Sequence, residues 1–89
     1  MKVVLNQRCG GYSLSEAAFK ELGMPWDGYG FAFDKDRANP ELVRVVEKLG
    51  RAADGAYAQL VVVEIPDGID WRVERDYDGC EAIYEGRVW

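Results

Sequence analysis

A glycine-containing turn near the N-terminus carries the residues best suited to binding chemistry. Residues 6–13 read N-Q-R-C-G-G-Y-S and precede a predicted helix. Glycines let backbone amides approach a ligand, a helix N-terminus favours anions, an arginine adds positive charge, and a tyrosine ring can stack on a base. The spacings G-x-x-x-x-G-K and G-x-G-x-x-G are absent, and an ordinary strand-to-helix turn has a similar composition. The candidate ligand-binding residues of this turn are Asn6, Arg8, Cys9, Gly10, Gly11, Tyr12 and Ser13.

Cys9 is the candidate nucleophile of this turn, because a thiol beside Arg8 and near a helix N-terminus can react as a thiolate. The chain has no histidine, which excludes Cys-His and Ser-His pairs and removes the commonest general base and metal ligand. Cys9 and Cys80 are expected to be free thiols in a reducing cytosol. The sequence therefore predicts a non-enzymatic protein with no catalytic residue, no metal and no cofactor.

An aromatic segment supplies the second group of candidate binding residues. Residues 24–33 read M-P-W-D-G-Y-G-F-A-F, in which one proline and two glycines exclude a helix. A short strand is predicted over Phe31 to Phe33. The rings can stack on a nucleobase, helped by a nearby arginine, or they can form the core of a small domain. The candidate ligand-binding residues from this region are Trp26, Tyr29 and Arg37.

The net charge of −5 is concentrated in the C-terminal part of the chain, where residues 64–85 hold far more acidic than basic side chains. This distribution argues against nucleic-acid binding, which needs lysine and arginine to contact phosphates. The segment 76–81, D-Y-D-G-C-E, is only faintly similar to a calcium loop and lacks the twelve-residue pattern. No apolar stretch approaches a membrane span or the core of a signal peptide, so a cytoplasmic protein is expected.

The hydrophobic pattern predicts a single α+β domain over residues 1–89, in the order β-α-(β)-α-β-β-β. A mostly antiparallel sheet would carry two helices packed on one face. The segment 58–65, A-Q-L-V-V-V-E-I, is apolar on both sides and is therefore expected to be the central strand. The position of the first strand, residues 2–7, in the sheet is not determined by the pattern.

Capping and turn signals place the remaining elements. Ser13 followed by Glu16 predicts a capping box at the start of a helix over residues 14–22. Asn39 before a proline predicts the start of a second helix. The pair Asp67-Gly68 predicts a hairpin turn into a strand over residues 69–74, and residues 80–85 would form the third strand of this meander.

Four stretches of the chain carry a family resemblance. They read K-V-V-L-N-x-R-C-G-G-Y-S-L-S, N-P-E-L-V-R-V-V-E-K-L-G, L-V-V-V-E-I-P-D-G-I-D-W and Y-D-G-C-E-A-I-Y-E-G-R-V-W. Together they resemble a family of short bacteriophage proteins that have no assigned activity. The resemblance implies a phage origin and the host cytoplasm. Family members tend to carry a histidine before the terminal Arg-x-Trp, and this chain does not.

Small phage proteins outside the virion often counteract host defence, and three hypotheses follow from this prior and the candidate residues. The first is a non-enzymatic binder that sequesters a small anionic, nucleotide-type signal. The second is an acidic protein–protein inhibitor that occupies the basic surface of a host defence protein or nucleic-acid-binding protein. The third is a small enzyme that uses Cys9. A homo-oligomer is compatible with the first two, because an unpaired sheet edge can pair with a second copy.

Overall fold

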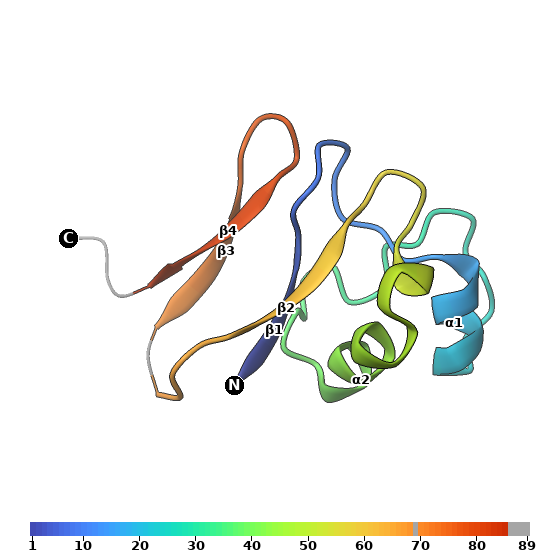
Figure 1. The fold of residues 1–89 in the computed structure, drawn as a ribbon, viewed down its shortest axis with the longest axis horizontal. Helices are drawn as coiled ribbons and strands as arrows, with labels where there is room; N and C mark the ends of the chain where they lie inside the picture. The colour runs from blue at the N-terminus through green and yellow to red at the C-terminus, as the bar shows by residue number, and fades with distance from the viewer. Residues whose placement is uncertain (69, 86–89) are drawn as a thin grey trace.

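Two helices and two small antiparallel sheets make up the protein in this computed structural model, which describes residues 1–68 and 70–85 (Figure 1). The elements in chain order are β1 (Lys2–Asn6), α1 (Glu16–Leu22), α2 (Pro40–Leu49), the 3-10 helix η1 (Gly50–Ala53), β2 (Leu60–Glu64), β3 (Trp71–Arg75) and β4 (Glu81–Glu85). The predicted α+β class is confirmed. Among these described elements, no helix is long and apolar enough to cross a membrane.

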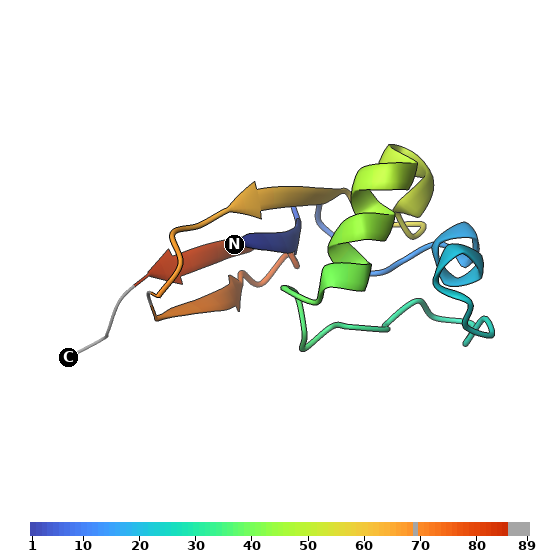
Figure 2. The ribbon, with the colours of Figure 1, turned by 90° about the horizontal axis from the view of Figure 1, so that it is seen from below.

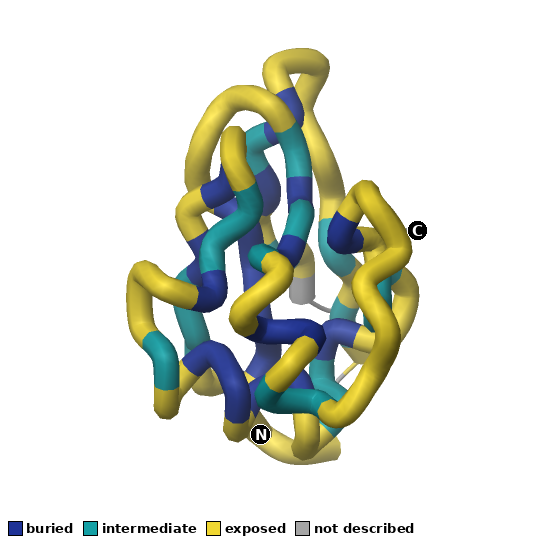
Figure 3. The backbone as a smooth tube through the Cα atoms, turned by 90° about the vertical axis from the view of Figure 1, so that its right-hand side faces the viewer, coloured by how far each residue is buried: buried dark blue, intermediate teal, exposed yellow. Residues whose placement is uncertain are grey.

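The sheet formed by β1 and β2 lies between two other layers (Figure 1). Side chains alternate between the two faces of a strand. On one face, Val4 and Leu60 join the core cluster that contains the buried residues of α1 and α2. On the other face, Val3 and Leu5 pack with apolar side chains of the hairpin β3–β4. Figure 3 shows these buried segments inside the molecule, with most of the turns exposed around them.

The most buried strand is β1, and the prediction that residues 58–65 form the central strand is wrong. The predicted cover on both sides is confirmed, because Leu60 and Val62 pack with the helices whereas Val61 and Val63 pack with the β3–β4 hairpin. Four of the five β1 residues are buried, whereas Leu60 is the only buried residue of β2. β2 pairs only with β1 among the described residues. The second edge of β1 is instead covered by polar groups, because Val4 N–H donates to the carbonyl of Arg37 and Asn6 N–H donates to the carboxylate of Glu81.

The predicted meander from β2 through β3 to β4 is also wrong, because β3 pairs with β4 and not with β2. After Pro66 the chain crosses to the uncovered face of the β1–β2 sheet, where Trp71, Val73 and Ile83 pack on it. The β1–β2 sheet has two apolar faces. The helices cover only one of them, and the β3–β4 hairpin covers the other. Ile69, the predicted first residue of this strand, lies outside the described residues.

The chain between α1 and α2 forms turns, and the predicted strand over Phe31 to Phe33 is absent. Asp34 N–H donates to the carbonyl of Phe31 and Asp36 N–H donates to the carbonyl of Phe33. Phe33 itself has a positive φ of 62°, which a strand cannot accommodate. Turn hydrogen bonds therefore outweigh the short alternating pattern of this segment.

The second helix begins as predicted, and the first begins two residues later than expected. In α2, Asn39 caps the helix by accepting a hydrogen bond from Glu41 N–H at 2.9 Å. In α1 the cap is Ser15, whose Oγ accepts from Ala18 N–H at 3.1 Å, so the predicted cap at Ser13 is wrong. Ser13 instead lies in the irregular chain before α1, and its carbonyl accepts a hydrogen bond from Gly55 N–H at 3.0 Å.

Candidate functional site

An open groove of about 480 Å³ brings the two predicted groups of binding residues together. We call it the aromatic groove, because four of the aromatic side chains that line it are exposed to solvent: Trp26, Tyr29, Phe31 and Tyr57. It is lined by Gly10, Tyr12, Ser13, Leu14, Ser15, Glu16, Trp26, Gly28, Tyr29, Phe31, Asp54, Gly55, Ala56 and Tyr57. Tyr29 and Phe31 stack on each other with ring centroids 5.8 Å apart and an interplanar angle of 11°. Exposed, pre-stacked rings offer a flat surface to a planar ligand.

Local hydrogen bonds hold the aromatic loop in place. The carboxylate of Asp27 accepts hydrogen bonds from Tyr29 N–H at 2.7 Å and from Gly30 N–H at 2.6 Å. These backbone donors lower the pKa of Asp27 because they stabilise its charged form. Gly30 then docks on the chain before α1, since its carbonyl accepts a hydrogen bond from Leu14 N–H at 2.8 Å.

The glycine turn forms the other wall of the groove, and Asn6 organises it. The buried Asn6 amide donates to the carbonyls of Arg8 and Gly79, and its oxygen accepts from the N–H groups of Arg8 and Gln59. Gly10 packs against Tyr57 so closely that an added Cβ would lie 2.6 Å from the Tyr57 Cβ. The glycine is therefore required by packing at this position.

A smaller pocket of about 270 Å³ adjoins the aromatic groove. We call it the basic pocket; it is lined by Arg8, Arg51, Asp54, Ala58 and Gln59. Both arginines are exposed, and Asp54 lines the pocket and the groove alike. One carboxylate oxygen of Asp54 accepts a hydrogen bond from Leu60 N–H at 3.0 Å. Two cations thus line a pocket that shares the carboxylate of Asp54 with the aromatic groove.

Arg37 lies behind the groove and is fully engaged by the protein. Its guanidinium donates to both carboxylate oxygens of Glu81, at 2.5 and 2.7 Å, and to the carboxylate of Asp34 at 2.8 Å. Its carbon Cζ lies 3.9 Å from the centre of the Tyr12 ring. Burial alone would lower the pKa of Arg37, but the hydrogen bonds to the two carboxylates outweigh it and raise that pKa. Arg37 therefore joins the β3–β4 hairpin to the body of the protein.

The structure divides the predicted binding residues into three groups. Gly10, Tyr12, Ser13, Trp26 and Tyr29 line the aromatic groove, and Arg8 lines the basic pocket. Asn6 and Arg37 are buried and hold the surrounding turns. Cys9 and Gly11 line neither cavity.

Sequence reasoning missed one complete wall of the groove. In the sequence, Asp54 and Gly55 indicate only a turn, and no motif around Tyr57 marks it as a binding residue. Tyr57 is 68% exposed and faces the same groove as Tyr29. An aromatic residue two positions after an Asp-Gly pair is the sequence signal that marks this wall.

Tyr12 is expected to make the stability of the protein depend on pH in the alkaline range. Its hydroxyl donates to the carbonyl of Ala32 at 2.6 Å, and burial raises its pKa above the ordinary value of 10.0, although the positive charge of Arg37 opposes the shift. The folded state thus holds the phenolic proton more tightly than the unfolded state does. The stability linked to this proton is complete below about pH 10 and is lost as the pH rises further.

We therefore expect Tyr12→Phe to reduce the loss of stability between about pH 10 and 11. The measurement is the urea midpoint as a function of pH, with Tyr77→Phe as the control because Tyr77 is fully exposed. Identical pH profiles for Tyr12→Phe and the unmodified protein would contradict this assignment.

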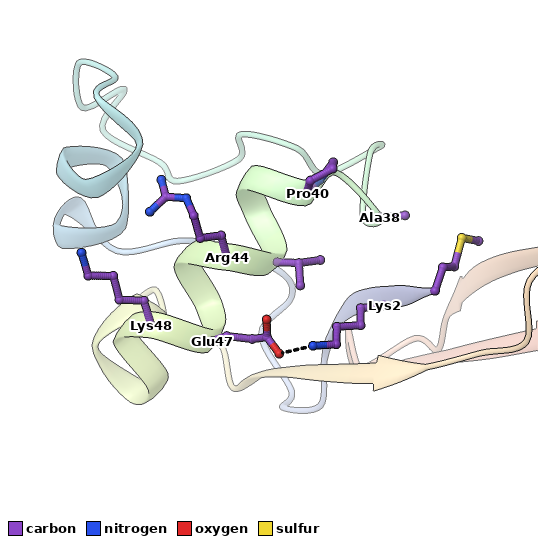
Figure 4. A pocket seen from close by; sticks show the side chains of 8 residues that line it. Lys2, Ala38, Pro40, Arg44, Glu47 and Lys48 are labelled. Atoms are coloured by element: carbon purple, nitrogen blue, oxygen red, sulfur yellow. Dashed lines mark hydrogen bonds and ion pairs between the residues drawn. The ribbon is translucent and has the colours of Figure 1, made fainter.

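A larger groove of about 630 Å³ lies between α2 and the start of β1 (Figure 4). Lys2 Nζ donates to Glu47 across it at 2.8 Å. The other cations on its wall are also paired: Arg44 with Glu41 at 2.6 Å, and Lys48 with a carboxylate of α1 at 2.8 Å. It contains none of the predicted binding residues, and its cations are already paired with carboxylates. The aromatic groove with the basic pocket is therefore the better candidate site.

Comparison with known proteins found no matching family model, no similar curated protein and no similar solved structure.

Proposed function

We propose that this protein is a non-enzymatic binder that sequesters a small anionic ligand of nucleotide type. Such an activity suits a small phage protein that counteracts host defence in the host cytoplasm. The observation that supports it is the junction at Asp54 of an exposed aromatic groove and a pocket with two arginines. A nucleotide has two parts that match this site: a planar base for the aromatic groove and a charged phosphate for the arginines.

In this proposal the base stacks on the exposed rings of the aromatic groove. Stacking of one base on an aromatic side chain contributes about 1–3 kcal/mol by alanine substitution, and it tolerates different bases because every base has a π face. The exposed rings that can accept it are those of Trp26, Tyr29, Phe31 and Tyr57. The phosphate lies at Arg8, whose guanidinium can form paired hydrogen bonds with phosphate oxygens. The carboxylate of Asp54 accepts a hydrogen bond from a sugar hydroxyl at the junction.

Calorimetric titration with a panel of linear and cyclic nucleotides tests this proposal. Tyr57→Ala is expected to weaken binding by about 5- to 100-fold, and Arg8→Ala is expected to weaken it and to reduce its dependence on salt. Tyr77→Ala and Lys20→Ala are matched controls, since both residues are exposed and line neither cavity. The proposal fails if no nucleotide binds, or if Tyr57→Ala binds as tightly as the controls do.

The alternative candidate is an inhibitor that binds a basic protein surface. It is favoured by Tyr77, which is fully exposed at the tip of the β3–β4 hairpin between Asp76 and Asp78. Exposed tyrosines often anchor protein interfaces. Part of the remaining acidic charge is already paired within the protein, since the buried Glu81 pairs with Arg37 and the half-exposed Glu74 pairs with Arg72.

The two candidates respond to different substitutions. Tyr77→Ala combined with Asp78→Lys is expected to abolish inhibition only if a protein surface is the target, whereas Tyr57→Ala is expected to abolish it only if the groove binds a ligand. The third hypothesis, a Cys9 enzyme, predicts loss of activity in Cys9→Ser. The binding proposal predicts full activity in that variant, because Cys9 lines neither cavity.

A further inference from the structure

The outer edge of β2 exposes backbone hydrogen-bonding groups that have no partner among the described residues. In an antiparallel pair, alternate residues direct their backbone groups to the neighbouring strand. Ile65 N–H donates to the carbonyl of Met1 and Gln7 N–H donates to the carbonyl of Gln59. The odd-numbered residues of β2 therefore face β1. Val62 and Glu64 direct their N–H and C=O groups outward, and we call these four groups the open edge.

The other edge of the same sheet is closed by dedicated contacts. Val4 N–H donates to the carbonyl of Arg37 at 2.9 Å, and Arg37 Nη1 donates back to the carbonyl of Val4 at 3.3 Å. Asn6 N–H donates to Glu81 at 2.8 Å. Proteins commonly protect exposed edges with lysine, proline or a bulge. The open edge has none of these within Leu60–Glu64, and its pairing with β1 is continuous.

Two features limit the open edge to a short segment. Leu60 N–H, which also faces outward, already donates to Asp54 Oδ1 at 3.0 Å. Pro66 has no N–H group and cannot extend a ladder. Val62 and Glu64 are therefore the residues of β2 that offer an added strand both a donor and an acceptor. Figure 2 shows β2 along one rim of the molecule, where a second strand can approach.

We propose that the open edge pairs with β2 of a second copy of this chain, antiparallel, about a two-fold axis at Val63. Val62 then lies opposite Glu64 of the second copy, and each exchanges both backbone hydrogen bonds with the other. In this register, Pro66 of one copy meets Leu60 of the other. The residue without an N–H thus faces the residue whose N–H is already bonded. The two positions that cannot donate to a neighbouring strand therefore lie opposite each other in this register. An unrelated peptide strand has no reason to match both limits.

The proposed pairing of two β2 strands brings no like charges opposite each other. Glu64 is the only charged residue of β2, and it lies opposite Val62 of the second copy, not opposite the other Glu64. Lys2 is its cross-strand neighbour on β1, and the charge of Glu64 helps to raise the pKa of Lys2, after the larger effect of Glu47. Each Glu64 therefore has a cation beside it within its own copy. The result is a four-stranded sheet in the order β1–β2–β2–β1.

Sedimentation velocity over a wide range of protein concentration tests the dimer. Glu64→Pro removes one outward N–H without touching the bonds to β1, and it is expected to weaken self-association by about tenfold or more. Glu64→Gln keeps the N–H and is expected to dimerise at least as well as the unmodified protein. A monomer at all concentrations, or a dimer that Glu64→Pro leaves unchanged, overturns the proposal.

Amide hydrogen exchange of the unmodified protein provides an independent test that does not depend on a variant folding. The amides of Val61 and Val63 face β1 and are expected to be protected at every concentration. The amides of Val62 and Glu64 are expected to exchange rapidly in dilute protein and slowly in concentrated protein. Rapid exchange of these two amides in a dimer would place the interface elsewhere and reject this edge.

Discussion

Glu81→Gln is expected to lower the free energy of unfolding by about 3–5 kcal/mol, because it leaves a buried arginine without its main counter-charge. The side chains of Glu81 and Arg37 are 1% and 4% exposed. Glu81 accepts two hydrogen bonds from Arg37 and a third from Asn6 N–H. Glutamine keeps one acceptor oxygen but replaces the other with a donor that faces the guanidinium. The remaining carboxylate partner of Arg37 is Asp34, which is only partly buried.

Urea unfolding followed by tryptophan fluorescence measures this loss. Glu74→Gln is the matched control: Glu74 also pairs with an arginine, Arg72, but both of those side chains are about half exposed, and such a surface pair contributes at most about 1 kcal/mol. Equal effects of the two substitutions would show that the Arg37–Glu81 pair is accessible to water. A double variant, Arg37→Met with Glu81→Leu, is expected to recover part of the stability, because it leaves no buried charge.

The sequence predicted the local elements better than their partners. The β-branched run of β2, the alternating pattern of β3 and the Asn-Pro start of α2 depend on neighbouring residues, and all three elements are present. The pairing of strands depends on contacts between distant residues. Arg37 and Glu81 are 44 positions apart, and nothing near either residue shows that together they close the second edge of β1.

The difference between local patterns and contacts between distant residues also explains which parts of the candidate site the sequence predicted. Trp26 and Tyr29 share the aromatic groove with the glycine turn because Gly30 bonds to Leu14, a contact between segments that the pattern did not connect. Arg37 was predicted to bind a ligand because an arginine near aromatic residues has that appearance in sequence. In the fold, carboxylates of Asp34 and Glu81 already occupy its donors.

Gly30→Ala is expected to detach the aromatic loop and to lower both stability and ligand binding. Gly30 has a φ of 87°, which costs an L-residue about 1–2 kcal/mol. A Cβ at this position would also lie 2.9 Å from the nitrogen of Leu14 and closer still to its carbonyl oxygen. Backbone atoms cannot move aside as a flexible side chain can, so overpacking adds about 1–3 kcal/mol.

Gly28→Ala separates these two effects. Gly28 has nearly the same φ, 86°, but an added Cβ there would have no neighbouring atom within 4 Å. It is therefore expected to show only the backbone cost, and to retain the hydrogen bond between Leu14 and Gly30. Urea unfolding gives the difference between the two variants. Nucleotide titration of folded Gly30→Ala then reports whether the groove depends on this contact. If both alanine variants lose the same stability and bind equally, the loop does not need its close approach to Leu14, and the aromatic groove is held by the Asp27 turn alone.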